Sequence, residues 1–208
     1  MYLIVKVIDF INHIDKVIFL FLNRDVANPV FDAVMPFITN KNNFNVLFIL
    51  IILGLLIFGG KKGRIAVLLG LIIVTLSDQL SSAVVKPLVG RIRPCHPDFL
   101  IAGARYLIGY KTSFSFPSSH AANMASTATW FSYRYKRYTW IFVTIAVLVG
   151  YSRIYVGVHY PTDVLGGAVI GVFCALMVMG AERGIAGLWR KSMDKRQTGG
   201  EGVQEEDS

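Results

Sequence analysis

Six ionisable side chains stand at the edges of long apolar segments of this chain. They are Lys86, Arg93, His120, Arg153, His159 and Asp163. A charge near a bilayer is costly unless it is paired or lines a wet cavity. Three cations can hold the oxygens of a phosphate group, and two imidazoles with a carboxylate can supply a nucleophile and a proton. The set therefore predicts cleavage of a phosphate ester.

The first pair of cations is Lys86 and Arg93. Pro87 and Pro94 disfavour a continuous helix, so we expect the pair to bracket a helix end and a loop. The guanidinium is a planar fork that fits phosphate oxygens, whereas the ammonium is a compact point charge. Alternatively, both side chains only reach for lipid headgroups. The two further motifs argue against that alternative.

The second motif is Pro117-Ser118-Ser119-His120. Proline and serine are favoured where a helix begins, and a helix N-terminus offers free N–H groups to an anion. These residues could merely start a helix. That account leaves an ionisable His120 at the head of an apolar helix unexplained.

The third motif runs from Ser152-Arg153 to His159 and Asp163. Arg153 and His159 do not share a helical face, so a loop must bring them together. Pro161 suits the first turn of the following helix, which Asp163 could simply stabilise through the helix dipole. Asp163 could also accept the Nδ1–H of His159 and leave Nε2 free as a nucleophile.

The two cysteines predict neither a disulfide framework nor a metal site. Cys174 lies within an apolar run and Cys95 in a polar loop, so we do not expect them to meet. Cys95-His96 could be half of a metal site, but no second pair has the spacing of metal ligands. We expect no metal and no cofactor.

Composition places the chain in a membrane. Of its 208 residues 54% are hydrophobic and 16% charged, against about a quarter charged in soluble domains. The net charge of +8 could suggest nucleic acid, but the cations fall between apolar runs and no nucleic-acid motif is present.

Hydropathy predicts an all-α integral membrane bundle of five or six transmembrane helices with an N-terminal interfacial amphipathic helix. Polar residues interrupt the first 23 residues, which favours the interfacial helix over a tilted span. We divide the chain into an N-terminal segment (1–43), a transmembrane core (44–185) and a cytoplasmic, disordered tail (186–208). Helices are expected at 29–38, 44–60, 65–85, 119–133, 139–151 and 161–182, the fourth and fifth short for a span.

Charge predicts the topology. Three basic clusters belong in the cytoplasm by the positive-inside rule: 61–64, 134–137 and the positions after 182. Tracing the chain then brings all three motifs to the opposite side. The motif loop is itself cationic, with Arg91, Arg105 and Lys111, which would suit an anionic substrate.

These motifs resemble the signature of the type 2 phosphatidic acid phosphatase family, whose relatives include vanadium haloperoxidases and glucose-6-phosphatase. The matching patterns are Lys-x6-Arg-Pro, Pro-Ser-x-His and Ser-Arg-x5-His-x3-Asp, within residues 86–163. One position departs: Ser119 stands where the family more commonly has glycine. The family is thought to use the backbone N–H there, which serine retains.

The resemblance implies a role for each residue. His159 resembles the nucleophile that forms a phosphohistidine, Asp163 its orienting partner, and His120 the general acid and then base. The implied phosphate ligands are Lys86, Arg93, Arg153, Ser118 and the N–H of Ser119.

The function expected is a metal-independent membrane phosphatase that removes a terminal phosphate from a lipid, on the periplasmic or extracellular face of a bacterial inner membrane. Undecaprenyl diphosphate is the preferred substrate. Phosphatidylglycerophosphate, phosphatidic acid and lipid A 1-phosphate are alternatives. More remote are a vanadium haloperoxidase-like enzyme and a catalytically inactive lipid-binding protein. The oligomeric state stays open.

Overall fold

A computed structural model describes residues 2–201, which form helices and turns without a strand. The all-α prediction is confirmed. In chain order the elements are α1 (Tyr2–Leu20), η1 (Phe21–Asp25), α2 (Pro29–Thr39), η2 (Lys41–Phe44), α3 (Asn45–Phe58), α4 (Gly60–Gln79), η3 (Leu80–Val85), α5 (Lys86–Val89), η4 (Pro97–Phe99), α6 (Ser119–Arg134), η5 (Lys136–Tyr138), α7 (Thr139–Tyr155) and α8 (Pro161–Glu201).

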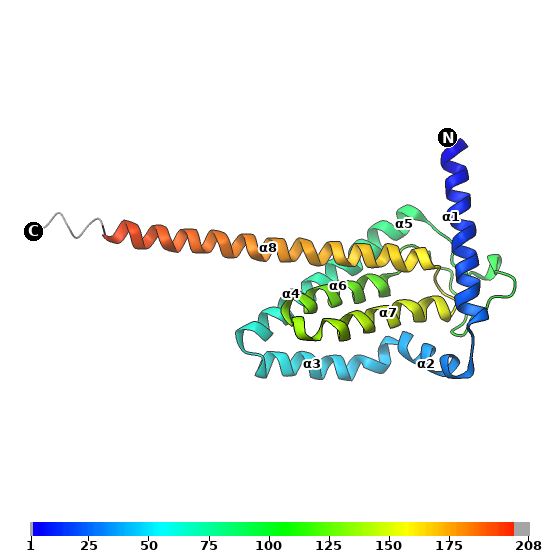
Figure 1. The fold of residues 1–208 in the computed structure, drawn as a ribbon, viewed down its shortest axis with the longest axis horizontal. Helices are drawn as coiled ribbons and strands as arrows, with labels where there is room; N and C mark the ends of the chain where they lie inside the picture. The colour runs from blue at the N-terminus through cyan, green and yellow to red at the C-terminus, as the bar shows by residue number, and fades with distance from the viewer. Residues whose placement is uncertain (1, 202–208) are drawn as a thin grey trace, which may run out of the picture.

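Five helices, α3, α4, α6, α7 and α8, run lengthwise in one bundle (Figure 1). Among the described residues, four helical segments are long and apolar enough to cross a membrane: Lys41–Phe58, Gly60–Val89, Lys136–Tyr155 and Pro161–Met193. The apolar side chains of α3 face outward, as a lipid-facing helix requires. The chain is therefore an integral membrane protein. The predicted count of five or six spans stays a prediction, since α6 has 16 residues.

Helix α6 occupies the middle of the bundle and packs closely on α8. A Cβ added to Gly171 would lie 2.1 Å from the carbonyl oxygen of Ala122, and one added to Gly167 would lie 2.3 Å from that of Ser118. The backbones can approach this far only because both positions are glycine. Two small residues four positions apart are typical of such close helix packing.

Two helices reach further into the motifs than their apolar runs indicate. The segment predicted to end at residue 85 continues through α5 and stops at Gly90, whose φ of +61° is the left-handed conformation of a helix end. Lys86 thus lies in the last helical turn and Arg93 in the loop beyond, as predicted. Helix α7 continues to Tyr155 and carries Arg153.

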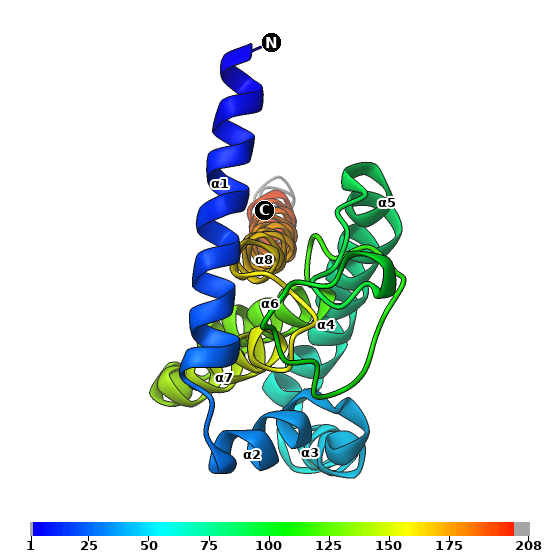
Figure 2. The same cartoon turned by 90° about the vertical axis from the view of Figure 1, so that its right-hand side faces the viewer.

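Helix α1 runs across the end of the bundle rather than along it (Figures 1 and 2). Its junction with the core is fixed by Asn23, which is fully buried. The amide nitrogen of Asn23 donates to the carbonyl oxygens of Arg105 and Tyr155, and its oxygen accepts from the Arg105 N–H. This orientation suits a helix in the membrane interface, which stays a prediction for α1.

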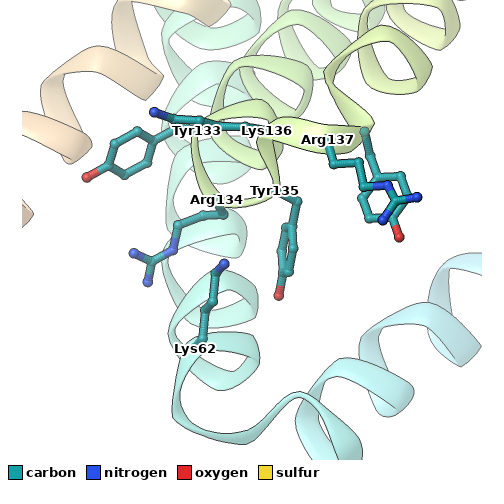
Figure 3. A pocket seen from close by; sticks show the side chains of 7 residues that line it. Lys62, Tyr133, Arg134, Tyr135, Lys136 and Arg137 are labelled. Atoms are coloured by element: carbon teal, nitrogen blue, oxygen red, sulfur yellow. The ribbon is translucent and has the colours of Figure 1, made fainter.

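The opposite end of the bundle gathers two of the basic clusters. Lys62 of α4 lies beside Arg134, Lys136 and Arg137 around a cavity of about 470 Å³, shown in Figure 3. Helix α8 extends beyond this end, to Glu201, through part of the tail that the sequence predicts to be disordered (Figure 1). The stretch from 188 to 197 contains mostly good helix formers and no proline, which accounts for the continuation.

Candidate active site

His159 lies in the short connection between α7 and α8 and is 2% exposed. Its Nδ1 is 3.4 Å from Oδ2 of Asp163, in the first turn of α8. The same oxygen accepts the N–H of Tyr160 at 2.8 Å. Gly157 makes the connection possible, because its φ is +87° and a Cβ there would lie 2.2 Å from the carbonyl oxygen of Arg105.

The tautomer of His159 follows from its second neighbour. Nη1 of Arg93 is 2.9 Å from Nε2 of His159. A guanidinium can only donate, so Nε2 must be the unprotonated nitrogen and Nδ1 must carry the proton toward Asp163. This is the tautomer that the sequence motif predicts. Burial, followed by the charge of Arg93, holds the pKa of His159 well below its usual range, so the imidazole is neutral.

Arg93 is held in place by the backbone. Its Nη1 donates to the carbonyl oxygen of Val158 at 2.8 Å, and its Nε donates to that of Ser113 at 2.8 Å. The side chain is 5% exposed, and burial lowers its pKa, although it stays charged. The guanidinium therefore faces the imidazole in one fixed orientation.

Arg153 reaches the site from the last turn of α7 and is 4% exposed. Its Nη1 donates to Oγ1 of Thr39, the last residue of α2, while its buried Nε has no protein partner. Lys86, the first residue of α5, is half-buried and lies within electrostatic range of Arg93 and Arg153. The structure thus brings together the three cations singled out in the sequence.

The start of α6 completes the site. Ser118 is the residue before the helix, and its N–H donates to the carbonyl oxygen of Asp163 at 2.9 Å. The hydroxyls of Ser118 and Ser119 are buried without a hydrogen-bond partner in the protein. Ser118 therefore does not cap the helix with its side chain, which argues against the interpretation that this motif merely starts a helix. Unpaired buried donors here fit an anion at the helix N-terminus.

His120 is half-buried in the first turn of α6 and borders a cavity of about 490 Å³. Most of the wall is apolar and comes from α2, α3, α6 and α7. The polar members of the wall are Thr39, Lys41, Asp78, Ser119, His120 and Asn123. The cavity thus joins the predicted general acid to a hydrophobic space of the kind that holds a hydrocarbon chain.

Three contributors to this site, Thr39, Arg91 and Asp15, lie outside the set of residues predicted from the sequence. Thr39 positions Arg153, and Arg91 donates from Nη1 to Oδ1 of Asp163 at 2.8 Å and from Nη2 to Oδ2 of Asp15 at 2.6 Å. Arg91 was counted only among the cations that attract a substrate. One signal was available: Arg91 lies two residues before Arg93 in a segment whose other residues are apolar, glycine or proline.

The remaining candidates form no second site. Cys95 and Cys174 are both buried and unpaired with each other. Among the side chains that the structure describes, no group of three or more His, Cys, Asp or Glu could hold a metal ion. His96 instead lies 3.7 Å from the carboxylate of Asp98 in its own loop.

With the geometry established, comparison with known proteins identifies the family. The profile described as the PAP2 superfamily matches residues 66–184, which contain all eight candidate residues. The chain belongs to the PAP2 superfamily. It is 34% identical to a lipid A 4'-phosphatase of Bacteroides thetaiotaomicron, over 80% of this chain and 76% of the relative. It is also 30% identical to the undecaprenyl-diphosphatase BcrC of Bacillus subtilis, over 72% of this chain and 74% of the relative.

A solved PAP2 structure shares the fold. The transmembrane PAP2 type phosphatidylglycerolphosphate phosphatase of Bacillus subtilis superimposes with a TM-score of 0.64 and 29% identity, covering 84% of this chain and 87% of that one. The resemblance inferred from the three motifs is confirmed. The protein is a PAP2 phosphatase of the membrane-embedded kind.

Proposed function

We propose that this PAP2 enzyme removes a terminal phosphate from a membrane lipid through a phosphohistidine at His159. The observation that carries the proposal is the position of His159, whose Nε2 lies 2.9 Å from the guanidinium of Arg93 while its Nδ1 faces Asp163 at 3.4 Å. A neutral, oriented imidazole is ready to attack phosphorus without first losing a proton.

The surrounding donors suit the transferring phosphoryl group. Arg93, Arg153 and Lys86 supply positive charge, and the hydroxyls of Ser118 and Ser119 supply buried donors that the protein leaves unpaired. An incoming phosphate would take over the Arg93 N–H from Nε2 and so free the nucleophile. Fixed positive groups stabilise the charge of the transition state in the way metal ions do in other phosphoryl transfer enzymes.

His120 then acts as the general acid for the leaving oxygen and as the base for the water that hydrolyses the intermediate. Its place at the cavity wall supports this role, because a lipid lying in the cavity would present its ester oxygen beside the imidazole. Turnover by the purified protein should persist in EDTA and be inhibited by vanadate. A strict requirement for Mg²⁺ would contradict the mechanism.

Within the lipid phosphates, a diphosphate is the first candidate, with undecaprenyl diphosphate as the preferred substrate. Lys41 lines the same cavity wall as Ser119 and His120, beyond the three cations of the motifs. When a diphosphate is cleaved, the leaving group is itself an anionic phosphate. A further cation next to the general acid would offset that charge.

Lipid A carrying a 4'-phosphate is the second candidate, supported by the 34% identity to the Bacteroides enzyme. Here the leaving group is an alcohol, which carries no phosphate charge for Lys41 to offset once His120 has protonated it. Phosphate release from undecaprenyl diphosphate, lipid A, phosphatidylglycerophosphate and phosphatidic acid should be compared for the wild type, Lys41→Gln and the control Lys136→Gln, which lies at the other end of the bundle. We expect Lys41→Gln to lower kcat/KM for the diphosphate selectively. An equal effect on all four lipids would remove the argument for a diphosphate.

We also propose that the site faces the periplasm or the outside of a bacterial inner membrane. Support comes from the basic groups around Lys62 and Arg134, which gather at the end opposite the site. A reporter fused after Ala104 should report an external position and one fused after Lys62 a cytoplasmic position. The reverse pattern would overturn this orientation.

A further inference from the structure

We propose that Arg91 and Asp15 are positioning residues, through which helix α1 holds the carboxylate of Asp163 in the orientation that His159 needs. The inference rests on the proposed role of His159. It assigns the N-terminal helix a part in catalysis beyond lying in the membrane interface.

The two oxygens of Asp163 are divided between two tasks. Oδ2 faces Nδ1 of His159 at 3.4 Å and accepts the N–H of Tyr160. Oδ1 accepts a hydrogen bond from Nη1 of Arg91 at 2.8 Å. The carboxylate is fully buried, and a buried charge is costly without such partners. Arg91 therefore both neutralises Asp163 and fixes its rotation.

Arg91 is fixed in turn from α1. Its Nη2 donates to Oδ2 of Asp15 at 2.6 Å, and its guanidinium lies over the ring of Tyr160, 4.2 Å from the ring centre. Both terminal nitrogens are thus engaged with carboxylates. A guanidinium facing two carboxylates is not a phosphate ligand, so Arg91 acts through Asp163 rather than on the substrate.

Asp15 also binds the start of α8 directly. Its Oδ1 accepts the N–H of Thr162 at 2.9 Å, and its Oδ2 accepts the hydroxyl of the same residue. Asp15 is 1% exposed although it lies in a helix whose neighbouring side chains are largely exposed. A carboxylate at a helix N-terminus is stabilised by the free N–H groups there. The contact attaches α1 to Thr162, the residue immediately before Asp163.

The test compares Asp15→Asn with Asp9→Asn, which alters an exposed carboxylate of the same helix. Elution profile and thermal midpoint are measured first, so that only folded protein is compared. We expect Asp15→Asn to lower kcat by about 10- to 100-fold, as when outer partners that orient a reactive group are removed. KM should stay within about twofold, because neither residue contacts the substrate. Asp9→Asn should behave as the wild type.

Chemical rescue separates positioning from a structural role. Arg91→Ala should lose kcat to a similar extent and regain part of it when millimolar guanidinium is added, whereas ethylammonium should restore less. The rate of phosphoenzyme formation in a single turnover should fall and recover in parallel. Asp15→Asn decides the question if Arg91→Ala does not fold, because it changes a charge with little change in shape.

Two outcomes would overturn the inference: unchanged kcat in Asp15→Asn, or a raised KM with unchanged kcat in either variant. Its failure can be told apart from failure of the proposed function. If His159→Ala is inactive while Asp15→Asn is normal, only the positioning role is lost. If His159→Ala keeps the wild-type rate, the proposed function itself is wrong.

Discussion

The N–H of Ser118 donates to the backbone carbonyl oxygen of Asp163, across 2.9 Å. This single bond joins the starts of α6 and α8, the two helices that carry the predicted general acid and the partner of the predicted nucleophile. The glycines of α8 make the approach possible, since Gly167 lies directly against Ser118. The relative position of the two histidines is therefore set by backbone packing and not by the loops alone.

That packing predicts a stability difference between two glycines of α8. Gly171→Ala would place a Cβ 2.1 Å from the Ala122 carbonyl oxygen, so α6 and α8 would have to separate. We expect a loss of about 1–3 kcal/mol of unfolding free energy, the usual cost of overpacking. Gly180→Ala is the matched control, because nothing lies within 4 Å of its added Cβ. Thermal unfolding in detergent should show a lowered midpoint for the first variant only. Equal midpoints would mean that the helices are not tightly packed at Ala122.

Arg93→Lys should impair turnover although it keeps the charge. The guanidinium donates through Nε to Ser113 and through Nη1 to Val158 and His159, a set that a lysine ammonium cannot reproduce. We expect kcat/KM to fall on the order of a hundredfold, as for other lost donors to a transition state. Full activity would show that turnover needs only a positive charge at position 93 and not the fork of donors of the guanidinium.

The pH dependence should reflect the buried state of His159. Burial, then the charge of Arg93, holds the pKa of this imidazole well below its ordinary value of about 6.5. A lowered pKa keeps Nε2 unprotonated as the pH falls through 6.5. For an activated aryl phosphate, the acid limb of kcat/KM that is due to His159 should therefore lie well below that value. A limb centred on the ordinary value would contradict this environment.

Much of the arrangement could be predicted from the sequence because proline and serine residues mark where its helices begin. Pro29, Pro161 and the Pro117-Ser118 pair mark helix starts that the structure confirms. Spacing together with charge indicated that the three motifs meet at one end of the bundle, and they do.

The contacts that fix the site could not be predicted in this way, because they depend on how α1 and α2 dock. Asp15 was one of several polar residues interrupting an apolar pattern, and its burial follows only from the docking of α1 against α8. Thr39 ends a short helix and has no sequence feature that points to Arg153. Tertiary placement, not local propensity, gives both residues their partners.

The two histidines should fail in different ways, and this prediction tests their roles directly. His159→Ala removes the imidazole whose Nε2 faces Arg93, which is the proposed nucleophile. Both turnover and the covalent intermediate should therefore disappear. His120→Ala removes proton transfer, a contribution of about 10²–10⁴-fold, and leaves His159 able to attack. An activated aryl phosphate, whose leaving group needs no proton, should therefore rescue the first step in His120→Ala but not the second.

The measurement is rapid quench in alkali followed by detection of phosphohistidine, which is stable in alkali and labile in acid. In His120→Ala the intermediate should form from the aryl phosphate and then persist, because no base remains to activate water. Wild-type enzyme should show a shorter-lived intermediate, and His159→Ala none. Phosphate found on residue 120 in His159→Ala would exchange the two roles. His120 in the cavity wall would then be the nucleophile, and not His159 beside Arg93. Absence of any phosphohistidine in the wild type would instead indicate direct attack by water.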